Sequence, residues 1–164
     1  MQYSREQYVW EVLRLILGWF FLWAFLDKLF GFGFATTPSQ AWLHGGSPTY
    51  GFLKFASQGA LANFYQGLAG SQVVDWLFML GLLGVGLGLC LGVMVRLMSL
   101  VGMLMVLLMF TALSLPPANN PLFDEHIVYA VVFVGIYFTR PGQWFGLGRW
   151  WRSTALVRGY PWLE

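Results

Sequence analysis

An uncharged stretch, residues 15–26, stands near the start of the chain and has charged residues on both sides. An α-helix rises about 1.5 Å per residue, so this stretch and its flanking turns can cross most of a hydrocarbon core of about 30 Å. We predict a first membrane-spanning helix over about residues 9–35. A cleaved signal peptide is the alternative, because residues 33–35 resemble a cleavage site of small residues, but the charged pair and aromatic bulk argue against it.

The longest apolar region runs from residue 76 to residue 115, and Arg96 is its only charge. As a single helix of about 40 residues it would be about 60 Å long, roughly twice the hydrocarbon thickness. The region must therefore fold back on itself, near residues 92–99. We predict spanning helices over about residues 73–95 and 97–115.

A further spanning helix is predicted over about residues 120–139. Asn120 is a good N-cap and Pro121 suits the first helical position. Residues 140–142, Arg-Pro-Gly, are typical of a helix end. The pattern as a whole predicts an all-α integral membrane protein, a four-helix bundle in a single domain over residues 1–164.

The segment between the first two predicted spans, residues 36–72, is too long for a structureless loop. Thr37-Pro38 and Ser47-Pro48 each have the pattern of an N-cap followed by the first residue of a helix. We predict two or three short interfacial helices that cover the bundle at one membrane surface.

Composition supports the same class of protein. Of the 164 residues, 58% are hydrophobic and only 10% are charged, against about 45–50% and 25% in soluble domains. This hydrophobicity excludes a disordered chain, and a net charge of +2 is too small to indicate nucleic-acid binding. The single cysteine, Cys90, excludes an intramolecular disulfide and a cysteine-based zinc or iron–sulfur centre.

Basic residues are distributed unevenly between the two predicted membrane surfaces. Four spans place both termini and the turn near Arg96 on one side, which receives seven basic residues: Arg5, Arg14, Arg96, Arg140, Arg149, Arg152 and Arg158. The other side receives only Lys28 and Lys54. The positive-inside rule then predicts cytoplasmic termini in the cell inner (plasma) membrane. Residues 140–164 combine tryptophans with arginines, which is typical of an interfacial tail in contact with membrane lipid.

Charged residues are also predicted below the outer surface. Asp27 and Lys28 lie in the first helix, where a charge costs about 2.5–3.5 kcal/mol on insertion scales. Adjacent helical residues do not face each other, so each needs a partner elsewhere. We predict one buried polar cluster that contains Asp27, Lys28 and His126 and one or more of Asp75, Asp124 and Glu125. The alternative is structural: the helix dipole favours carboxylates at helix ends, and the lysine extends its ammonium group to the lipid headgroups.

A glycine-rich turn, residues 45–49, lies in the outer segment. Flexible glycines before a helix can present backbone N–H groups to an anion. The residues that would form such an oxyanion site are His44, Gly45, Gly46, Ser47 and Lys54. An ordinary Gly-Gly turn is the alternative interpretation.

Glycines recur at helical spacing in the second predicted span. Gly84, Gly88 and Gly92 fall at i, i+4 and i+8, with Gly81 close by. Such a stripe predicts close approach of another helix. Cys90, on the same span, is interpreted as a small packing residue rather than a carrier of a sulfur adduct.

Three segments are similar to the DoxX/DoxD family of membrane proteins. They are residues 18–31 (GWFFLWAFLDKLFG), residues 41–49 (AWLHGGSPT) and residues 120–122 (NPL) followed by His126. DoxD is the larger subunit of a membrane thiosulfate:quinone oxidoreductase, which couples two thiosulfates into tetrathionate and passes two electrons to quinone. The resemblance therefore implies an oxidoreductase subunit with quinone as electron acceptor and a DoxA-like small subunit as partner.

The same resemblance implies roles for individual residues. Candidate catalytic residues are Asp27, Lys28 and His126. Candidate thiosulfate-binding residues are His44, Gly45, Gly46, Ser47, Lys54 and Asp124. The sequence contains no recognisable metal or flavin motif.

Other function classes stay open. The chain could instead be a non-catalytic accessory or scaffold subunit of a larger respiratory or photosynthetic membrane complex, or form a homo-oligomer. A small-anion transporter is less favoured, because the sequence shows no inverted repeat.

Overall fold

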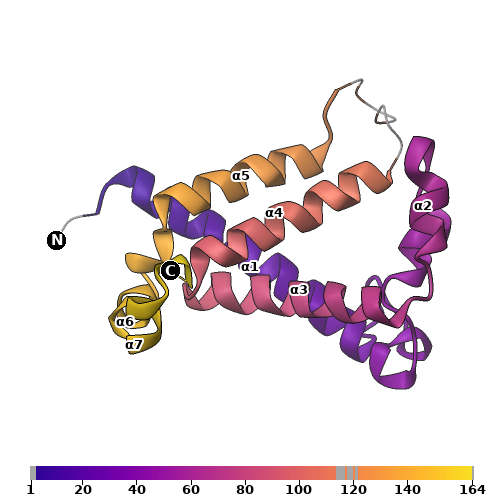
Figure 1. Ribbon diagram of the computed structural model, residues 1–164, viewed down its shortest axis with the longest axis horizontal. Coiled ribbons are helices and arrows are strands. Elements are labelled where there is room, and N and C mark those ends of the chain that lie inside the picture. The colour runs from indigo at the N-terminus through magenta and orange to yellow at the C-terminus, as the bar shows by residue number, and fades with distance from the viewer. Residues whose placement is uncertain (1–2, 114–116, 118–119, 121, 164) are drawn as a thin grey trace.

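The computed structural model describes residues 3–113, 117, 120 and 122–163 (Figure 1). These residues form an all-helical structure without strands. The four longest helices are α1 (Arg5–Phe30), α3 (Gln72–Leu91), α4 (Val95–Ala112) and α5 (Glu125–Thr139).

Three of these helices, α1, α3 and α4, are long and apolar enough to cross a membrane. The prediction of long apolar helices that could span a membrane is therefore confirmed for these three. Helix α5 is apolar but has 15 residues, so it is about 22 Å long and shorter than a typical span.

Helix α1 begins with a capping box. Ser4 Oγ accepts a hydrogen bond from Gln7 N, and Gln7 Oε1 accepts one from Ser4 N. The helix ends at Phe30 because Gly31 adopts a left-handed conformation, with φ of 71°. The prediction that this helix continues to residue 35 is wrong, since the chain turns away at Gly31.

The turn between α3 and α4 lies where the sequence predicted it. Gly92 ends α3 with φ of 73°, and Met94 also has positive φ before α4 begins at Val95. Glycine tolerates this conformation and most other residues do not.

Helix α5 begins later than predicted. Its N-cap is Asp124, whose Oδ1 accepts from His126 N at 2.9 Å. Asn120 instead accepts from Leu122 N and Phe123 N, which closes a separate turn before the helix. Asn120 as the N-cap is therefore wrong, and Pro121 lies outside the described residues.

The long helices pack in sequence, α1 against α3, α3 against α4 and α4 against α5. Figure 1 shows both chain ends at one end of the molecule, here called the tail end, and the segment 31–71 at the other, the loop end. The buried core between the helices consists of Leu17, Phe21, Met79, Leu82, Val85, Leu89, Val95, Val106, Ala130, Phe133 and Ile136.

Glycines on α3 allow this close packing. A Cβ at Gly88 or Gly84 would meet the Met98 side chain of α4, and one at Gly86 would lie 2.7 Å from Leu22 N of α1. The predicted close approach at the glycine stripe is confirmed, and α3 uses glycine on two faces.

At the loop end, residues 31–71 form one-turn helices and the short helix α2. These elements are Pro38–Gln40, Trp42–His44, Phe52–Ala56, Gly59–Leu61 and α2 (Ala62–Gly67). Ser47 Oγ accepts from Tyr50 N, as expected of a cap. Tyr65 Oη bonds Thr111 Oγ1 at 2.5 Å, and Gln58 N donates to Ala112 O, which attaches the segment to the end of α4.

At the tail end, residues 140–163 fold onto the turn between α3 and α4. They contain the helical turns Pro141–Gln143 and Pro161–Leu163 and the short helices α6 (Gly148–Ser153) and α7 (Ala155–Gly159). Leu147 N donates to Leu91 O at 2.9 Å.

Candidate functional site

Asp27 is almost fully buried at the loop end of α1, with 2% of its surface exposed. Its Oδ1 accepts a hydrogen bond from Phe34 N at 3.3 Å, and its Oδ2 accepts one from Ala35 N at 2.9 Å. The carboxylate therefore holds the chain that turns back after Gly31.

Lys28 follows Asp27 but points elsewhere. It is half-buried, and its Nζ lies 5.9 Å from the centre of the Phe78 ring on α3. Among the residues described, no carboxylate lies within ion-pair distance of this ammonium group. A nearby aromatic face stabilises a cation only modestly, so the Phe78 ring does not replace an ion-pair partner for Lys28.

Asp75 in the first turn of α3 anchors the loop-end segment. Its Oδ1 accepts from Ser47 Oγ at 2.9 Å, Thr49 Oγ1 at 2.6 Å and Thr49 N at 3.2 Å. These bonds give the buried Asp75 carboxylate and the Ser47 hydroxyl a structural role.

His126 and Asp124 form a local pair at the start of α5. His126 Nδ1 lies 2.9 Å from Asp124 Oδ2, and both side chains are partly exposed. Together with the exposed Glu125 they could offer ligand atoms within 4.8 Å of one another. Asp124 already serves as the N-cap of α5.

These groups do not form the single polar cluster that the sequence predicted. Within the described part of the chain, Asp27 bonds the segment after α1, Asp75 bonds residues 47 and 49, and Asp124 bonds His126. The expectation of one shared network is wrong, because backbone or hydroxyl donors of nearby segments satisfy Asp27 and Asp75 separately. The predicted proximity of His126 and Asp124 is confirmed, since these two side chains bond each other.

The glycine-rich turn is also occupied by internal bonds. Gly45 N donates to Trp42 O and Gly46 N donates to Ala41 O. His44 Nδ1 lies 2.7 Å from Pro38 O, and Lys54 is exposed on the π-helical turn Phe52–Ala56. An oxyanion site built from the N–H groups of Gly45 and Gly46 is therefore wrong, since both already donate to carbonyls.

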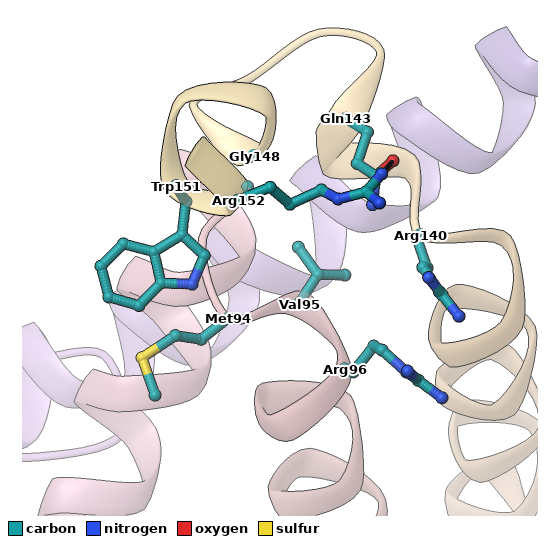
Figure 2. A pocket seen from close by; sticks show the side chains of 9 residues that line it. Met94, Val95, Arg96, Arg140, Gln143, Gly148, Trp151 and Arg152 are labelled. Carbon is teal, nitrogen blue, oxygen red and sulfur yellow. Dashed lines mark hydrogen bonds between the residues drawn. The ribbon is translucent and has the colours of Figure 1, made fainter. Parts of the chain in front are cut away.

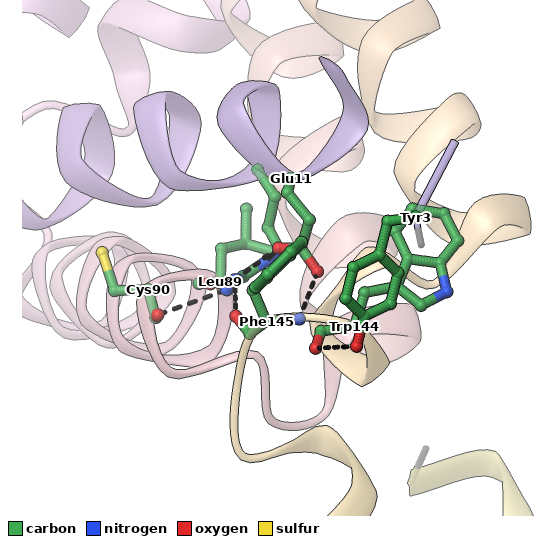
Figure 3. A network of polar contacts seen from close by, with 7 residues as sticks. Tyr3, Glu11, Leu89, Cys90, Trp144 and Phe145 are labelled. Atoms are coloured by element: carbon green, nitrogen blue, oxygen red, sulfur yellow. Dashed lines mark hydrogen bonds and ion pairs between the residues drawn. The ribbon is translucent and has the colours of Figure 1, made fainter. Parts of the chain in front are cut away.

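A second group of buried charges, the pair of Glu11 and Arg14, was missed by the sequence interpretation (Figure 3). Arg14 is 0% exposed and Glu11 3%. Arg14 Nη2 lies 2.7 Å from Glu11 Oε2. Their spacing of three residues on an apolar helix was a usable signal, because residues at i and i+3 share a helix face.

This pair joins three segments at the tail end. Arg14 donates to Leu89 O and Cys90 O at the end of α3 and, at 2.8 Å, to Phe145 O in the tail. Glu11 Oε1 accepts from Phe145 N at 2.9 Å. Arg14 thereby adds a donor to two carbonyls at the end of α3, one of which, Leu89 O, also accepts from Gly92 N.

Comparison with known proteins found no relative of this chain. No family model matches the chain, and neither the curated proteins nor the solved structures contain a match.

Proposed function

We propose that the chain is a four-span membrane subunit of the DoxX/DoxD type, with α5 as the fourth span. The alternating direction of α1, α3, α4 and α5 supports this topology, as does the position of both chain ends at the tail end (Figure 1). The seven-to-two distribution of basic residues supports a cytoplasmic tail end in the cell inner membrane.

We propose further that this subunit serves a thiosulfate:quinone oxidoreductase, and Lys28 is the observation that carries the proposal. A charge within a membrane segment usually has a partner or a task. Lys28 is half-buried without an ion-pair partner among the described residues, and backbone N–H groups already satisfy the neighbouring Asp27. A thiosulfate dianion at the loop end would give Lys28 an ion-pair partner.

The chemistry then divides between substrate and acceptor. Two thiosulfates lose one electron each and join through a new S–S bond to form tetrathionate. Quinone takes up the two electrons together with two protons. The partly exposed His126, paired with Asp124, is the candidate for handling a proton at this end of the molecule. A DoxA-like small subunit would complete the enzyme.

The experiment measures thiosulfate-dependent reduction of a quinone analogue by membranes with and without this protein. Lys28→Met should lower kcat/KM for thiosulfate by about tenfold or more, because a hydrogen bond to a charged group is worth about 1.5–3 kcal/mol. Arg5→Gln removes an exposed positive charge from the opposite end of α1 and is the matched control. Equal activity in the Lys28→Met and unsubstituted proteins, at equal protein yield, would contradict the proposal.

A second candidate function is that of an accessory subunit without catalysis. It is favoured by the structural bonds that occupy Asp27 and Asp75. Such a subunit would copurify with large cofactor-bearing partners. Membranes that contain the protein without those partners would show no thiosulfate-dependent reduction of quinone.

A further inference from the structure

Asp124 holds both the backbone and the ring of His126 at the start of α5. Its Oδ1 accepts a hydrogen bond from His126 N at 2.9 Å, and its Oδ2 lies 2.9 Å from His126 Nδ1. Asp124 is also the N-cap of α5. Because one carboxylate contacts two atoms of the same residue, it fixes the imidazole relative to the helix that carries it.

The contact between the two side chains decides which nitrogen of the neutral ring carries the proton. A carboxylate only accepts hydrogen bonds, so the ring nitrogen that faces it must donate. Asp124 Oδ2 therefore selects the tautomer of His126 with its proton on Nδ1. The other ring nitrogen, Nε2, is then an acceptor, and among the residues that the structure describes it has no hydrogen-bond partner. Since the side chain is partly exposed, Nε2 is the atom that can exchange a proton with the surroundings.

Asp124 is also the group placed to stabilise the ring once it is protonated. Helix α4, which packs along α5, carries one charge, Arg96. This arginine lies at the tail end near Arg140 (Figure 2) and donates to Tyr137 Oη at 3.1 Å, about three turns along α5 from His126. Within the described part of the chain, the ion-pair partner of the His126 ring is Asp124.

A histidine held in this way can carry protons one at a time. Its Nε2 accepts a proton from water, and the resulting imidazolium is paired with the Asp124 carboxylate. The same Nε2 then gives that proton to an oxygen of the reduced quinone, which returns the ring to its starting tautomer. Each cycle moves one proton, so two cycles supply the two protons that quinone takes up with two electrons. A carboxylate orients the histidine of a catalytic triad in the same manner, without taking the proton itself.

We propose that Asp124 is a positioning residue for His126, which it holds in the Nδ1–H tautomer so that Nε2 can relay protons to the quinone. This role rests on the proposed function for the identity of the proton acceptor, whereas the tautomer follows from the geometry alone. The same carboxylate would repel a thiosulfate dianion, so a positioning role suits Asp124 better than thiosulfate binding.

The test determines the tautomer of His126 by ¹⁵N NMR of the full-length protein in detergent, in mildly alkaline buffer, where an imidazole is ordinarily neutral. His44→Gln leaves His126 as the only histidine, because the chain has two. The expected result is a proton on Nδ1. Asp124→Asn keeps a side chain suited to an N-cap, but its carbonyl must face His126 N, so its NH₂ group faces the ring. The tautomer should therefore switch to Nε2–H in this variant.

Glu125→Gln is the matched control for the tautomer. It removes the same charge from the neighbouring residue, which is exposed and has no hydrogen bond to the ring in the described part of the chain. The proton should stay on Nδ1 in this variant.

Activity supplies a second measurement. In thiosulfate-dependent reduction of a quinone analogue, Asp124→Asn should lower kcat by about tenfold or more, with KM for thiosulfate unchanged. A proton on Nε2 in the unsubstituted protein would overturn the proposal even if the variant fails to fold, as would an unchanged tautomer or an unchanged kcat in Asp124→Asn. A proton on Nδ1 in an unsubstituted protein without activity would contradict the proposed function but support the positioning of His126 by Asp124.

Discussion

At the residue scale, the dominant polar feature is the Glu11–Arg14 pair at the tail end. Its two side chains are almost fully buried, and they bond each other, the end of α3 and the tail. Breaking a buried pair leaves the remaining charge uncompensated, at a cost of about 3–5 kcal/mol. This pair therefore matters more to stability than any exposed charge on the molecule.

We predict that Arg14→Met lowers the free energy of unfolding by about 3–5 kcal/mol, because Glu11 is left buried without its partner. Glu11→Gln combined with Arg14→Met should be less destabilising than Arg14→Met alone. Unfolding in detergent, followed by circular dichroism, measures both. Arg149→Met, an exposed site, is the control. A double variant less stable than Arg14→Met would contradict the pairing.

Sequence reasoning found the charged residues of the loop end but not their partners. It placed Asp27 in a buried position, which the structure confirms. Its partners, Phe34 N and Ala35 N, are backbone groups with no side-chain signature, and they reach the carboxylate only because Gly31 reverses the chain. Partners of this kind cannot be identified from residue types alone.

At the element scale, the apolar runs of the sequence located the helices. The residue at which a helix begins was harder to predict where two nearby residues could each serve as its N-cap. Asn120 and Asp124 both have side chains suited to an N-cap. The structure uses Asp124, whose carboxylate bonds both His126 N and the His126 ring and places negative charge at the positive end of the helix dipole. The glycine stripe was easier to interpret, because its spacing alone indicates close packing.

The two faces of α3 allow a matched prediction. Gly→Ala in a helix ordinarily stabilises by about 0.5–1 kcal/mol. At Gly86 the new Cβ would lie 2.7 Å from the Leu22 backbone, whereas at Gly84 it would lie 3.3 Å from Met98 Sδ, the flexible part of a side chain. Gly86→Ala should therefore destabilise by about 1–3 kcal/mol, and Gly84→Ala should be neutral or stabilising. Thermal unfolding of the two variants compares them, and equal stability would show that α1 and α3 can separate without cost.

At the scale of the whole molecule, the order of the helices and the position of the chain ends follow from the number of apolar runs. The fold of the tail onto the α3–α4 turn does not, because it depends on backbone contacts between Gly92, Gly142 and Gly148. Gly92 lies 50 residues or more before Gly142 and Gly148, and no sequence pattern marks these glycines as neighbours.

The proposed membrane orientation can be tested by labelling engineered cysteines in a Cys90→Ala background. Gln58 is exposed at the loop end and Ser153 is exposed in the tail. A membrane-impermeant maleimide should label Gln58→Cys in intact cells and Ser153→Cys only after permeabilisation. Labelling of both sites from outside would contradict the proposed topology.

The contacts of Arg14 bear on the order in which the chain assembles during synthesis. Glu11 lies within the same helical turn, so the two charges can neutralise each other as soon as α1 forms and can enter a bilayer as a pair. The other partners of Arg14, Leu89 and Phe145, lie 75 and 131 residues further along the chain. The contacts that complete α1 therefore come from residues far along the chain, so they can form only after α3 and the tail have been synthesised.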